Sequence, residues 1–394
     1  MEARLIEFVR THEGIRQHDQ SWYDVMKTTV GGSELAALMG CNPYSKFADV
    51  VANKRAGNKW NGGGPPCWWG TLFEDVINAY VTIDLGRKIH GDDICVQVIS
   101  GHRNSPDGYI IAQIYSDTDG DSAIWTTDLC PTIPTVEQIV LLEFKCPISR
   151  KPLGSVPPQY MPQVWSGLAV SPLAHFGLYV DAVFRKCALS DLGGVPGYDT
   201  VYHSRDTAKG SLSNLNRAPV AWGLVAIYAP MLSAPRHVRL GWHGESWAPG
   251  DPNPDSPDAD ASLAAWQIKK ACGEDVGSMD ARHFHRVLGL INRKRFLIQH
   301  ASPWFADGRG QESSVDAVID DLKKQAPMYY ELVSILPWKL IEVHYIPVDR
   351  RIGFLEEIIP LIAEVHAAVA APVVAGTAIN TTGDEVQDLF DSIV

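Results

Sequence analysis

Hydrophobic and polar positions repeat with two different periods along the chain. Apolar residues at helical spacing predict helices over residues 33–39, 47–54, 69–83, 159–170, 263–300, 314–333 and 354–371. Alternating or continuous apolar runs between turn residues predict strands over residues 95–99, 109–115, 123–127, 139–144, 175–184, 221–228 and 338–346. The remaining segments, including residues 61–66, are expected to be loops. This mixture predicts an α/β protein with a central mixed sheet flanked by helices.

The same pattern predicts how the chain is divided. Residues 1–30 are expected to be an N-terminal helix followed by a loop, and residues 31–240 the main core. Residues 241–374 are expected to include a Pro- and Asp-rich surface loop or linker at 248–262 and to add helices and strands that pack on the core. Residues 375–394 are acidic and rich in small residues, which predicts a mobile tail.

Composition narrows the class of protein. The net charge of −12 argues against a general nucleic-acid coat, although an enzyme with a local basic channel stays compatible with it. No run of 18 apolar residues predicts a membrane helix, and the N-terminus has no secretory signal pattern. The seven cysteines form no C-x-x-C pair, which disfavours zinc-ribbon and iron–sulfur sites. We therefore expect an intracellular protein with free thiols.

Candidate chemistry is concentrated at the end of the strand predicted over 139–144. Side chains alternate between the faces of a strand, so Glu143 and Lys145 point the same way while Phe144 turns into the core. Asp107 lies in a tight turn that leads into an earlier strand of the same sheet. Carboxylates beside an ammonium can hold a divalent cation and polarise an attacking water, as metal-dependent phosphodiesterases do. Their hard oxygens suit Mg²⁺ or Mn²⁺.

Taken alone, this pattern is common, and a surface salt bridge at a strand end is the favoured explanation of it. Three features favour a catalytic site. Four apolar residues precede Glu143, so its carboxylate is buried and needs a partner. Pro147 ends the strand directly after the lysine, and Gln163 lies on the next predicted helix.

Five motifs in order carry a resemblance to a known family. They are Gly31-Gly32-Ser33-Glu34, Trp69-Gly70-x-x-x-Glu74, Ser105-Pro106-Asp107-Gly108, Glu143-Phe144-Lys145-Cys146-Pro147 and Tyr160-Met161-Pro162-Gln163-Val164. Over residues 20–185 the chain resembles the phage lambda exonuclease and YqaJ-type viral recombinase nucleases of the PD-(D/E)xK superfamily, and the alkaline exonucleases of large DNA viruses. The resemblance implies a restriction-endonuclease-like core with helical C-terminal additions.

The resemblance also implies roles for single residues. Asp107, Glu143 and the Phe144 carbonyl would bind a metal, and Glu74 a second metal or its water. Lys145 would be the catalytic lysine and Gln163 would position the nucleophile. These assignments imply two Mg²⁺ ions per site, with Mn²⁺ as an alternative.

A second group of residues would bind the DNA end. By the resemblance, Ser33 and Ser105 would contact a 5′-phosphate, Ser33 partly through the N-terminus of its helix, and Tyr160 would support the site. The family has an arginine seven residues before Ser33, where this chain has Met26. Either the adjacent Lys27 takes its place, or the preference for a 5′-phosphate is weaker. The interval of 36 residues (143 − 107) is longer than in the phage enzyme and suggests an inserted hairpin.

The activity that follows is Mg²⁺-dependent exonuclease digestion of double-stranded DNA ends, 5′→3′, leaving 3′ single-stranded overhangs for viral recombination, replication or genome processing. Two alternatives stay open: a structure- or site-selective endonuclease or repair nuclease of the same fold, and a catalytically inactive DNA-binding protein. The resemblance also implies a homo-oligomer, by analogy a trimer, a single-strand annealing protein as partner, and a site of action in the host cytoplasm or nucleus.

Overall fold

The computed structural model describes residues 1–17, 20–55, 65–116, 122–124, 135–147, 150, 154–189, 221–231, 233, 297–300, 304–305 and 314–372. The chain divides into two compact units. Unit 1 comprises Met1–Asn58, Gly70–Ala182 and Val343–Thr377, and unit 2 comprises Lys59–Trp69, Val183–Glu342 and Ala378–Val394. The predicted linker at 248–262 and the predicted tail at 375–394 lie outside the described residues. No described helix is long and apolar enough to cross a bilayer.

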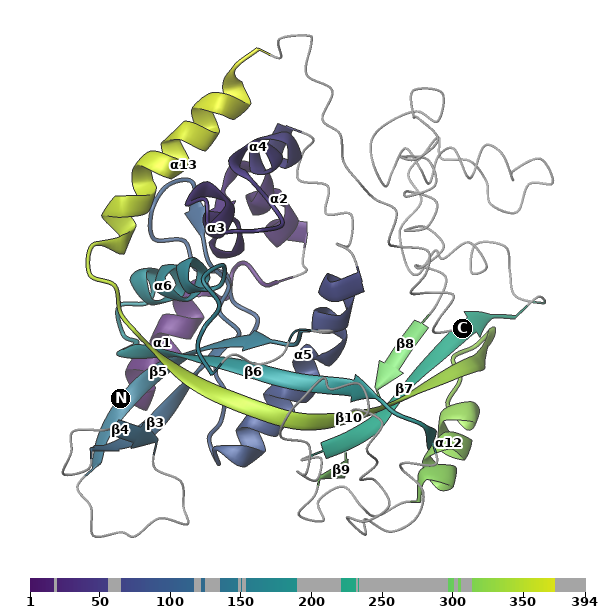
Figure 1. The fold of residues 1–394 in the computed structure, drawn as a ribbon. Coiled ribbons are helices and arrows are strands. Elements are labelled where there is room, and N and C mark those ends of the chain that lie inside the picture. The colour runs from purple at the N-terminus through teal and green to yellow at the C-terminus, as the bar shows by residue number, and fades with distance from the viewer. Residues whose placement is uncertain are drawn as a thin grey trace. The chain divides into compact units, whose positions relative to one another are not determined.

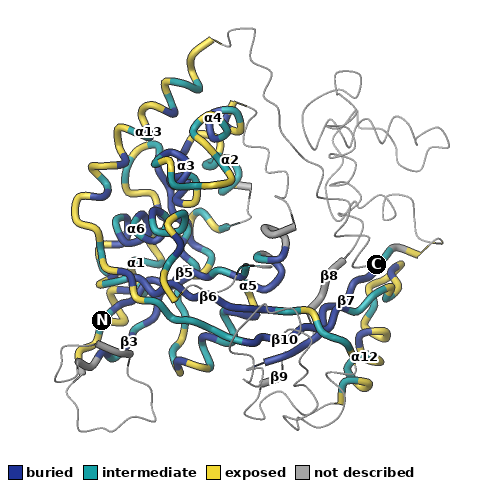
Figure 2. Tube along the Cα trace, viewed as in Figure 1, coloured by how far each residue is buried: buried dark blue, intermediate teal, exposed yellow. Residues whose placement is uncertain are grey.

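Unit 1 contains the mixed sheet that the sequence predicts. Its strands run in the order β4 (Ser122–Ile124), β3 (Gly108–Ser116), β5 (Thr135–Lys145), most of β6 (Phe176–Lys186) and the last part of β10 (Tyr330–Asp349). β3 is antiparallel to β4 and β5, whereas β5 and β6 are parallel. Figure 2 shows β6 and the second half of β5 mostly in the colour of buried residues, which agrees with their largely apolar sequences. The α/β fold with a mixed sheet flanked by helices is therefore confirmed.

Helices pack together beside this sheet. The helical elements of unit 1 are α1 (Glu2–His12), α2 (Gln20–Thr28), η1 (Gly32–Glu34), α3 (Leu35–Leu38), α4 (Phe47–Arg55), α5 (Pro65–Asp84), α6 (Met161–Val170) and α13 (Phe354–Ala370). Figure 1 shows α3, α4, α6 and α13 gathered on one side of β5 and β6. One apolar cluster, which includes Leu35, Val50, Phe354 and Ile358, joins three of these helices. A short parallel pair, β1 (Val30–Gly31) and β2 (His102–Arg103), lies beside them.

Two predictions for unit 1 are wrong. The segment expected to be a loop before residue 30 contains helix α2, whose half-buried Trp22 and Val25 are three residues apart and support a helical face. The strand expected over 95–99 is absent, and Ile94 and Val96 form only isolated bridges. Cys95 and Val96 are both buried and Val98 is 53% exposed, so burial does not alternate along this segment as it does in a strand with one buried face.

Helix α5 begins earlier than its apolar pattern indicates. The predicted loop over 61–66 overlaps its first turn, because α5 starts at Pro65. Proline is tolerated in the first turn of a helix, where its missing N–H has no intrahelical partner to lose. The additional turn leaves the position of Glu74 on this helix unchanged.

Unit 2 contains β7 (Ala221–Pro230), β8 (Leu297–His300), β9 (Trp304–Phe305), α12 (Val315–Lys324) and the first part of β10. β7 is antiparallel to β10, β8 and β9, and its Leu224, Ala226 and Tyr228 are buried with Leu322 of α12. Every residue of β7 from 221 to 228 is buried, which explains its unbroken apolar sequence.

Two helix predictions are wrong in this unit. The helix expected over 314–333 ends at Lys324, and β10 begins at Tyr330 after Tyr329, whose φ of 70° is incompatible with a continuing helix. The helix expected over 263–300 is contradicted at residues 297–300, which pair with β7 as β8. A segment of four residues is too short for its periodicity to separate strand from helix. The rest of that prediction lies outside the described part of the chain.

Candidate active site

The end of β5 brings the first three candidate residues together. Glu143 is 1% exposed, and Lys145, two residues later on the same face, donates a hydrogen bond to Glu143 Oε1. Gly108 of β3 pairs with Leu142, which places Asp107 beside the end of β5. Two main-chain bonds hold it there: Asp107 N–H donates to the Leu142 carbonyl at 3.2 Å, and Phe144 N–H donates to Asp107 Oδ2. Phe144 itself is turned into the core.

Burial and mutual repulsion raise the pKa values of these carboxyl groups. Burial, with repulsion from Asp107 and Glu74, raises the pKa of Glu143 to about 8 despite the attraction of Lys145. Burial also raises the pKa of Asp107. Although burial lowers the pKa of Lys145, the carboxylates of Glu143 and Asp107 raise it further, so the ammonium stays charged. The site holds one permanent cation among several carboxyl groups.

Glu74 joins this group from helix α5. The neighbouring Phe73, Val76 and Ile77 are buried, and Glu74 is half-buried at the edge of that apolar face. Burial, followed by repulsion from Asp107, raises the pKa of Glu74 to about 7. The three carboxyl groups therefore lie within each other's electric fields, although they come from separate elements.

Gln163 and Tyr160 lie at the start of helix α6. The Tyr160 ring is stacked on Tyr179 with centroids 6.0 Å apart, and Lys145 Nζ lies 5.4 Å from the Tyr160 centroid. Tyr160 therefore contacts the lysine of the site. Gln163 makes only main-chain hydrogen bonds within the described structure, and its side-chain amide is bonded to none of the carboxylates.

Sequence reasoning missed three residues beside Lys145. Arg150 Nη1 and Nη2 donate to the two oxygens of Asp181 at 2.8 and 3.0 Å, and Nη2 also donates to the Tyr179 hydroxyl at 3.2 Å. The register between strands β5 and β6 could have identified these residues. In the parallel pair of β5 and β6, Glu143 is opposite Tyr179 and Lys145 is opposite Asp181. Residues opposite each other point to the same face of a sheet.

A divalent cation matches the chemistry of this donor set. Three carboxyl groups with raised pKa values share one site, and a cation would offset the repulsion that raises them. The side chains that the structure describes form no ready-made group of three His, Cys, Asp or Glu ligands. Lys145 and the Phe144 N–H occupy carboxylate oxygens of Glu143 and Asp107 instead.

The residues expected to bind a DNA end are not all brought together. Ser105 Oγ accepts a hydrogen bond from Trp22 Nε1 at 3.3 Å. Lys27 is exposed and forms a surface ion pair with Asp24 at 2.7 Å. Ser33 is exposed and lies inside η1, whose N-cap is Gly31, so it does not cap a helix. No described contact joins Lys27 or Ser33 to Ser105.

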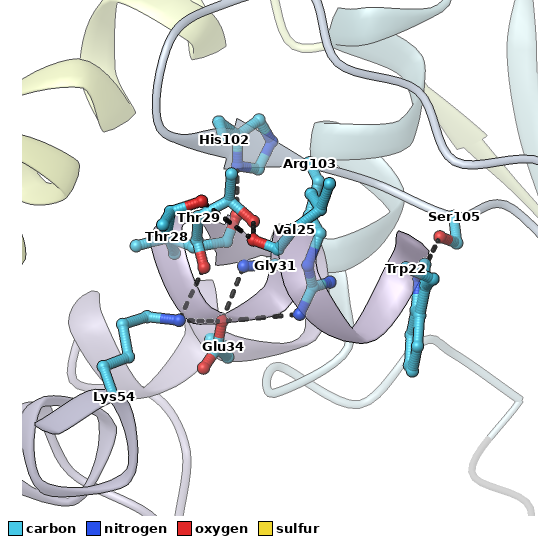
Figure 3. A network of polar contacts seen from close by, with 11 residues as sticks. Trp22, Val25, Thr28, Thr29, Gly31, Glu34, Lys54, His102, Arg103 and Ser105 are labelled. Atoms are coloured by element: carbon cyan, nitrogen blue, oxygen red, sulfur yellow. Dashed lines mark hydrogen bonds and ion pairs between the residues drawn. The ribbon is translucent and has the colours of Figure 1, made fainter. Parts of the chain in front are cut away.

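Glu34, Lys54 and Arg103 form a buried ionic cluster (Figure 3). Glu34 Oε2 accepts hydrogen bonds from Gly31 N–H at 2.6 Å and Lys54 Nζ at 3.0 Å, and it lies 4.0 Å from Arg103 Nη2. Lys54 Nζ also donates to the Thr29 carbonyl at 2.6 Å. The guanidinium of Arg103 lies 5.4 Å from the centroid of the Trp22 ring. No sequence motif singled out Arg103, and the basic pair Lys54-Arg55 was expected to be solvated surface, whereas Lys54 is buried.

Comparison with known proteins finds the family that the motifs resemble. Residues 21–174 match the YqaJ-like viral recombinase domain. The chain is 28% identical over 356 residues to a protein of African swine fever virus from a Malawi tick isolate, which covers 89% of this chain and 84% of that protein. The corresponding protein of the Vero-adapted Badajoz strain is 28% identical over 367 residues, covering 91% and 88%.

Two solved structures were also matched. The crystal structure of an alkaline exonuclease (LHK-Exo) from Laribacter hongkongensis has a TM-score of 0.28 and 18% identity, and the match covers 42% of this chain and 74% of that chain. The structure of LHK-Exo in complex with dAMP gives a TM-score of 0.28 and 18% identity, with 41% and 73% covered.

Proposed function

We propose that this chain is a metal-dependent DNA exonuclease acting on duplex ends, and the match of residues 21–174 to the YqaJ-like viral recombinase domain supports the proposal. The observation that carries the proposal is the convergence of Asp107, Glu143 and Lys145 at the end of β5. Two carboxylates and a lysine held by main-chain pairing are the groups that hydrolysis of a phosphodiester requires.

Each residue of the site has a separate proposed role. Asp107, Glu143 and the Phe144 carbonyl would hold one Mg²⁺ or Mn²⁺, and Glu74 would hold a second ion or its water. When bound, the cations supply Lewis-acid stabilisation of the phosphate and lower the pKa of a water. Lys145, whose ammonium stays charged, offsets the negative charge that develops on the phosphate. Gln163 orients the attacking water through its side chain.

The family suggests what the products are used for. We propose 5′→3′ digestion that leaves 3′ single-stranded overhangs, which a single-strand annealing protein could pair during viral recombination. A ring-shaped homo-oligomer, by analogy a trimer, would keep the enzyme on its strand. The viral relatives support a site of action inside an infected cell. Ser105 and Tyr160 would contact the DNA strand beside the carboxylates, with Ser33 and Lys27 at its end.

The decisive experiment compares linear duplex DNA, labelled at either end, with covalently closed circular DNA. We expect Mg²⁺-dependent release of nucleotides from the linear duplex, inhibition by EDTA and no cleavage of the circle. Cleavage of the circle would assign an endonuclease of the same fold. Lys145→Ala should abolish digestion while a circular dichroism melt still shows a folded protein. Full activity in that variant would rule out the assigned site.

A further inference from the structure

Arg103 has no hydrogen-bond partner in the described structure, although its side chain is only 7% exposed. Its Nε is fully buried and unpartnered, and its nearest charged atom, Glu34 Oε2, is 4.0 Å from Nη2. A guanidinium carries five N–H donors and remains charged in proteins. Leaving such a group buried without acceptors is costly, so an acceptor from another molecule is expected to complete this site.

The charges around Arg103 do not balance. Arg103 and Lys54 are both buried cations, and Glu34 is the carboxylate that lies between them (Figure 3). The Glu34 oxygen that faces them already accepts hydrogen bonds from Lys54 and from the Gly31 N–H. Within the described part of the chain the cluster therefore carries two positive charges and one negative charge. A buried excess of positive charge favours the binding of an anion.

The surroundings of the guanidinium place it beside the proposed active site. Arg103 packs over the Trp22 ring, and the Trp22 indole N–H is bonded to Ser105 Oγ (Figure 3). That hydroxyl also hydrogen-bonds to the Cys95 thiol, so a bound anion would take the Ser105 proton in place of the sulfur. Ser105 precedes Asp107 by two residues, which span at most about 7 Å of extended chain. An anion held by Arg103 and Ser105 therefore lies next to the carboxylates.

The backbone at Gly31 leaves room for the Arg103 side chain. A Cβ atom on Gly31 would lie 2.5 Å from Arg103 Nη1, so glycine leaves the room that the guanidinium occupies. Lys27, by contrast, is at the surface with Asp24.

We propose that Arg103, with Ser105 as a second donor, binds a phosphate group of the DNA strand next to the phosphodiester that is cleaved. The identification of the phosphate as part of DNA rests on the proposed function. A terminal 5′-phosphate and an internal phosphodiester share the same chemistry. A guanidinium recognises both through paired N–H donors.

The first test needs no nuclease activity. The thermal unfolding of the full-length, metal-free protein is followed with sodium phosphate and with sodium chloride at equal ionic strength. Phosphate should raise the melting temperature of the wild type and of Arg351→Gln, a control that removes an exposed arginine. In Arg103→Gln the phosphate-specific rise should disappear, and in Ser105→Ala, which leaves the ionic cluster intact, it should be smaller.

The outcomes of this test separate the two proposals. No phosphate-specific rise in the wild type overturns the role of Arg103 even if the protein digests DNA. A rise in a protein without nuclease activity leaves the anion site standing and refutes the proposed function. If Arg103→Gln does not fold, an unchanged phosphate response in folded Ser105→Ala is sufficient to reject the site.

The second test identifies the source of the phosphate. Steady-state digestion is measured on linear duplexes with 5′-phosphate or 5′-hydroxyl ends. Loss of a charge-assisted contact should raise the KM of Arg103→Gln about tenfold or more. A rise confined to 5′-phosphorylated ends assigns the terminal phosphate, and an equal rise on both ends assigns an internal phosphodiester. An unchanged KM on both ends in a folded variant refutes the proposal.

Discussion

The main-chain N–H of Phe144 donates a hydrogen bond to the carboxylate of Asp107, which ties the turn before β3 to the end of β5. The bond uses one oxygen of a side chain that we also assign to metal binding. Asp107 therefore has two roles, one in holding the strand ends together and one in chemistry. Substitutions that differ in only one of these properties can separate them.

Asp107→Asn should abolish nuclease activity but leave stability nearly unchanged. The amide oxygen of asparagine still accepts the Phe144 N–H, whereas a neutral amide is a much weaker ligand for a divalent cation. Asp107→Ala should abolish activity and also cost about 1–3 kcal/mol of stability, because the buried N–H loses its acceptor. Urea unfolding and digestion of a linear duplex measure the two effects. Equal stability of the two variants would contradict the structural role of this hydrogen bond.

Asp181→Asn should lower kcat about tenfold with little change in KM. Asp181 holds Arg150 through two hydrogen bonds, and Arg150 in turn contacts Tyr179 and the Tyr160 ring beside Lys145. Loss of a charge-assisted pair costs about 1.5–3 kcal/mol. Part of this cost should raise the activation barrier, because Lys145 is no longer held in its catalytic position. Steady-state kinetics on duplex DNA measure kcat and KM of this variant. The control is Glu357→Gln, which breaks an exposed ion pair of α13. A change in KM without a change in kcat would show that Arg150 contributes to DNA binding and not to the position of Lys145.

The sequence could predict the elements that carry the site because their patterns are local. An apolar run over 139–142 precedes Glu143 in its strand, and the helix of Glu74 has a clear apolar face. Contacts that depend on register or on side-chain direction had no such signal. Tyr179 and Asp181 join the site because β6 pairs with β5, and Arg103 meets Glu34 because β1 pairs with β2. Strand β8 was missed because its partner lies elsewhere in the sequence.

Lys54→Met should destabilise unit 1 by about 3 kcal/mol. The Lys54 side chain is 1% exposed and is bonded to Glu34 and to the Thr29 carbonyl, so its loss leaves both acceptors without that donor. Breaking a buried ion pair from one side costs about 3–5 kcal/mol, part of which Arg103 should offset through its own attraction to Glu34. Lys27→Met is the matched control, because the exposed pair of Lys27 with Asp24 should contribute less than about 1 kcal/mol. Chemical denaturation measures both, and equal losses would contradict the buried role of Lys54.

His102 should make the protein less stable as the pH falls from about 6.5 to about 4. The ring is fully buried, with Nδ1 2.9 Å from the Val30 carbonyl and Nε2 2.9 Å from Ser166 Oγ. Because the carbonyl can only accept, Nδ1 carries the proton and Nε2 accepts from Ser166 in the neutral ring. Burial lowers the pKa of His102 to about 4, below the value of about 6.5 in the unfolded chain.

The unfolded state therefore binds one more proton than the folded state between these two pKa values. The stability that depends on neutral His102 is complete above about pH 6.5, and about 3 kcal/mol of it is lost as the pH falls through the folded pKa. His102→Gln retains a polar side chain without this titration. The difference in unfolding free energy between wild type and His102→Gln, measured by urea denaturation from pH 7 to pH 4, should shrink by about that amount. A difference that stays constant over this range would show that His102 titrates normally in the folded protein.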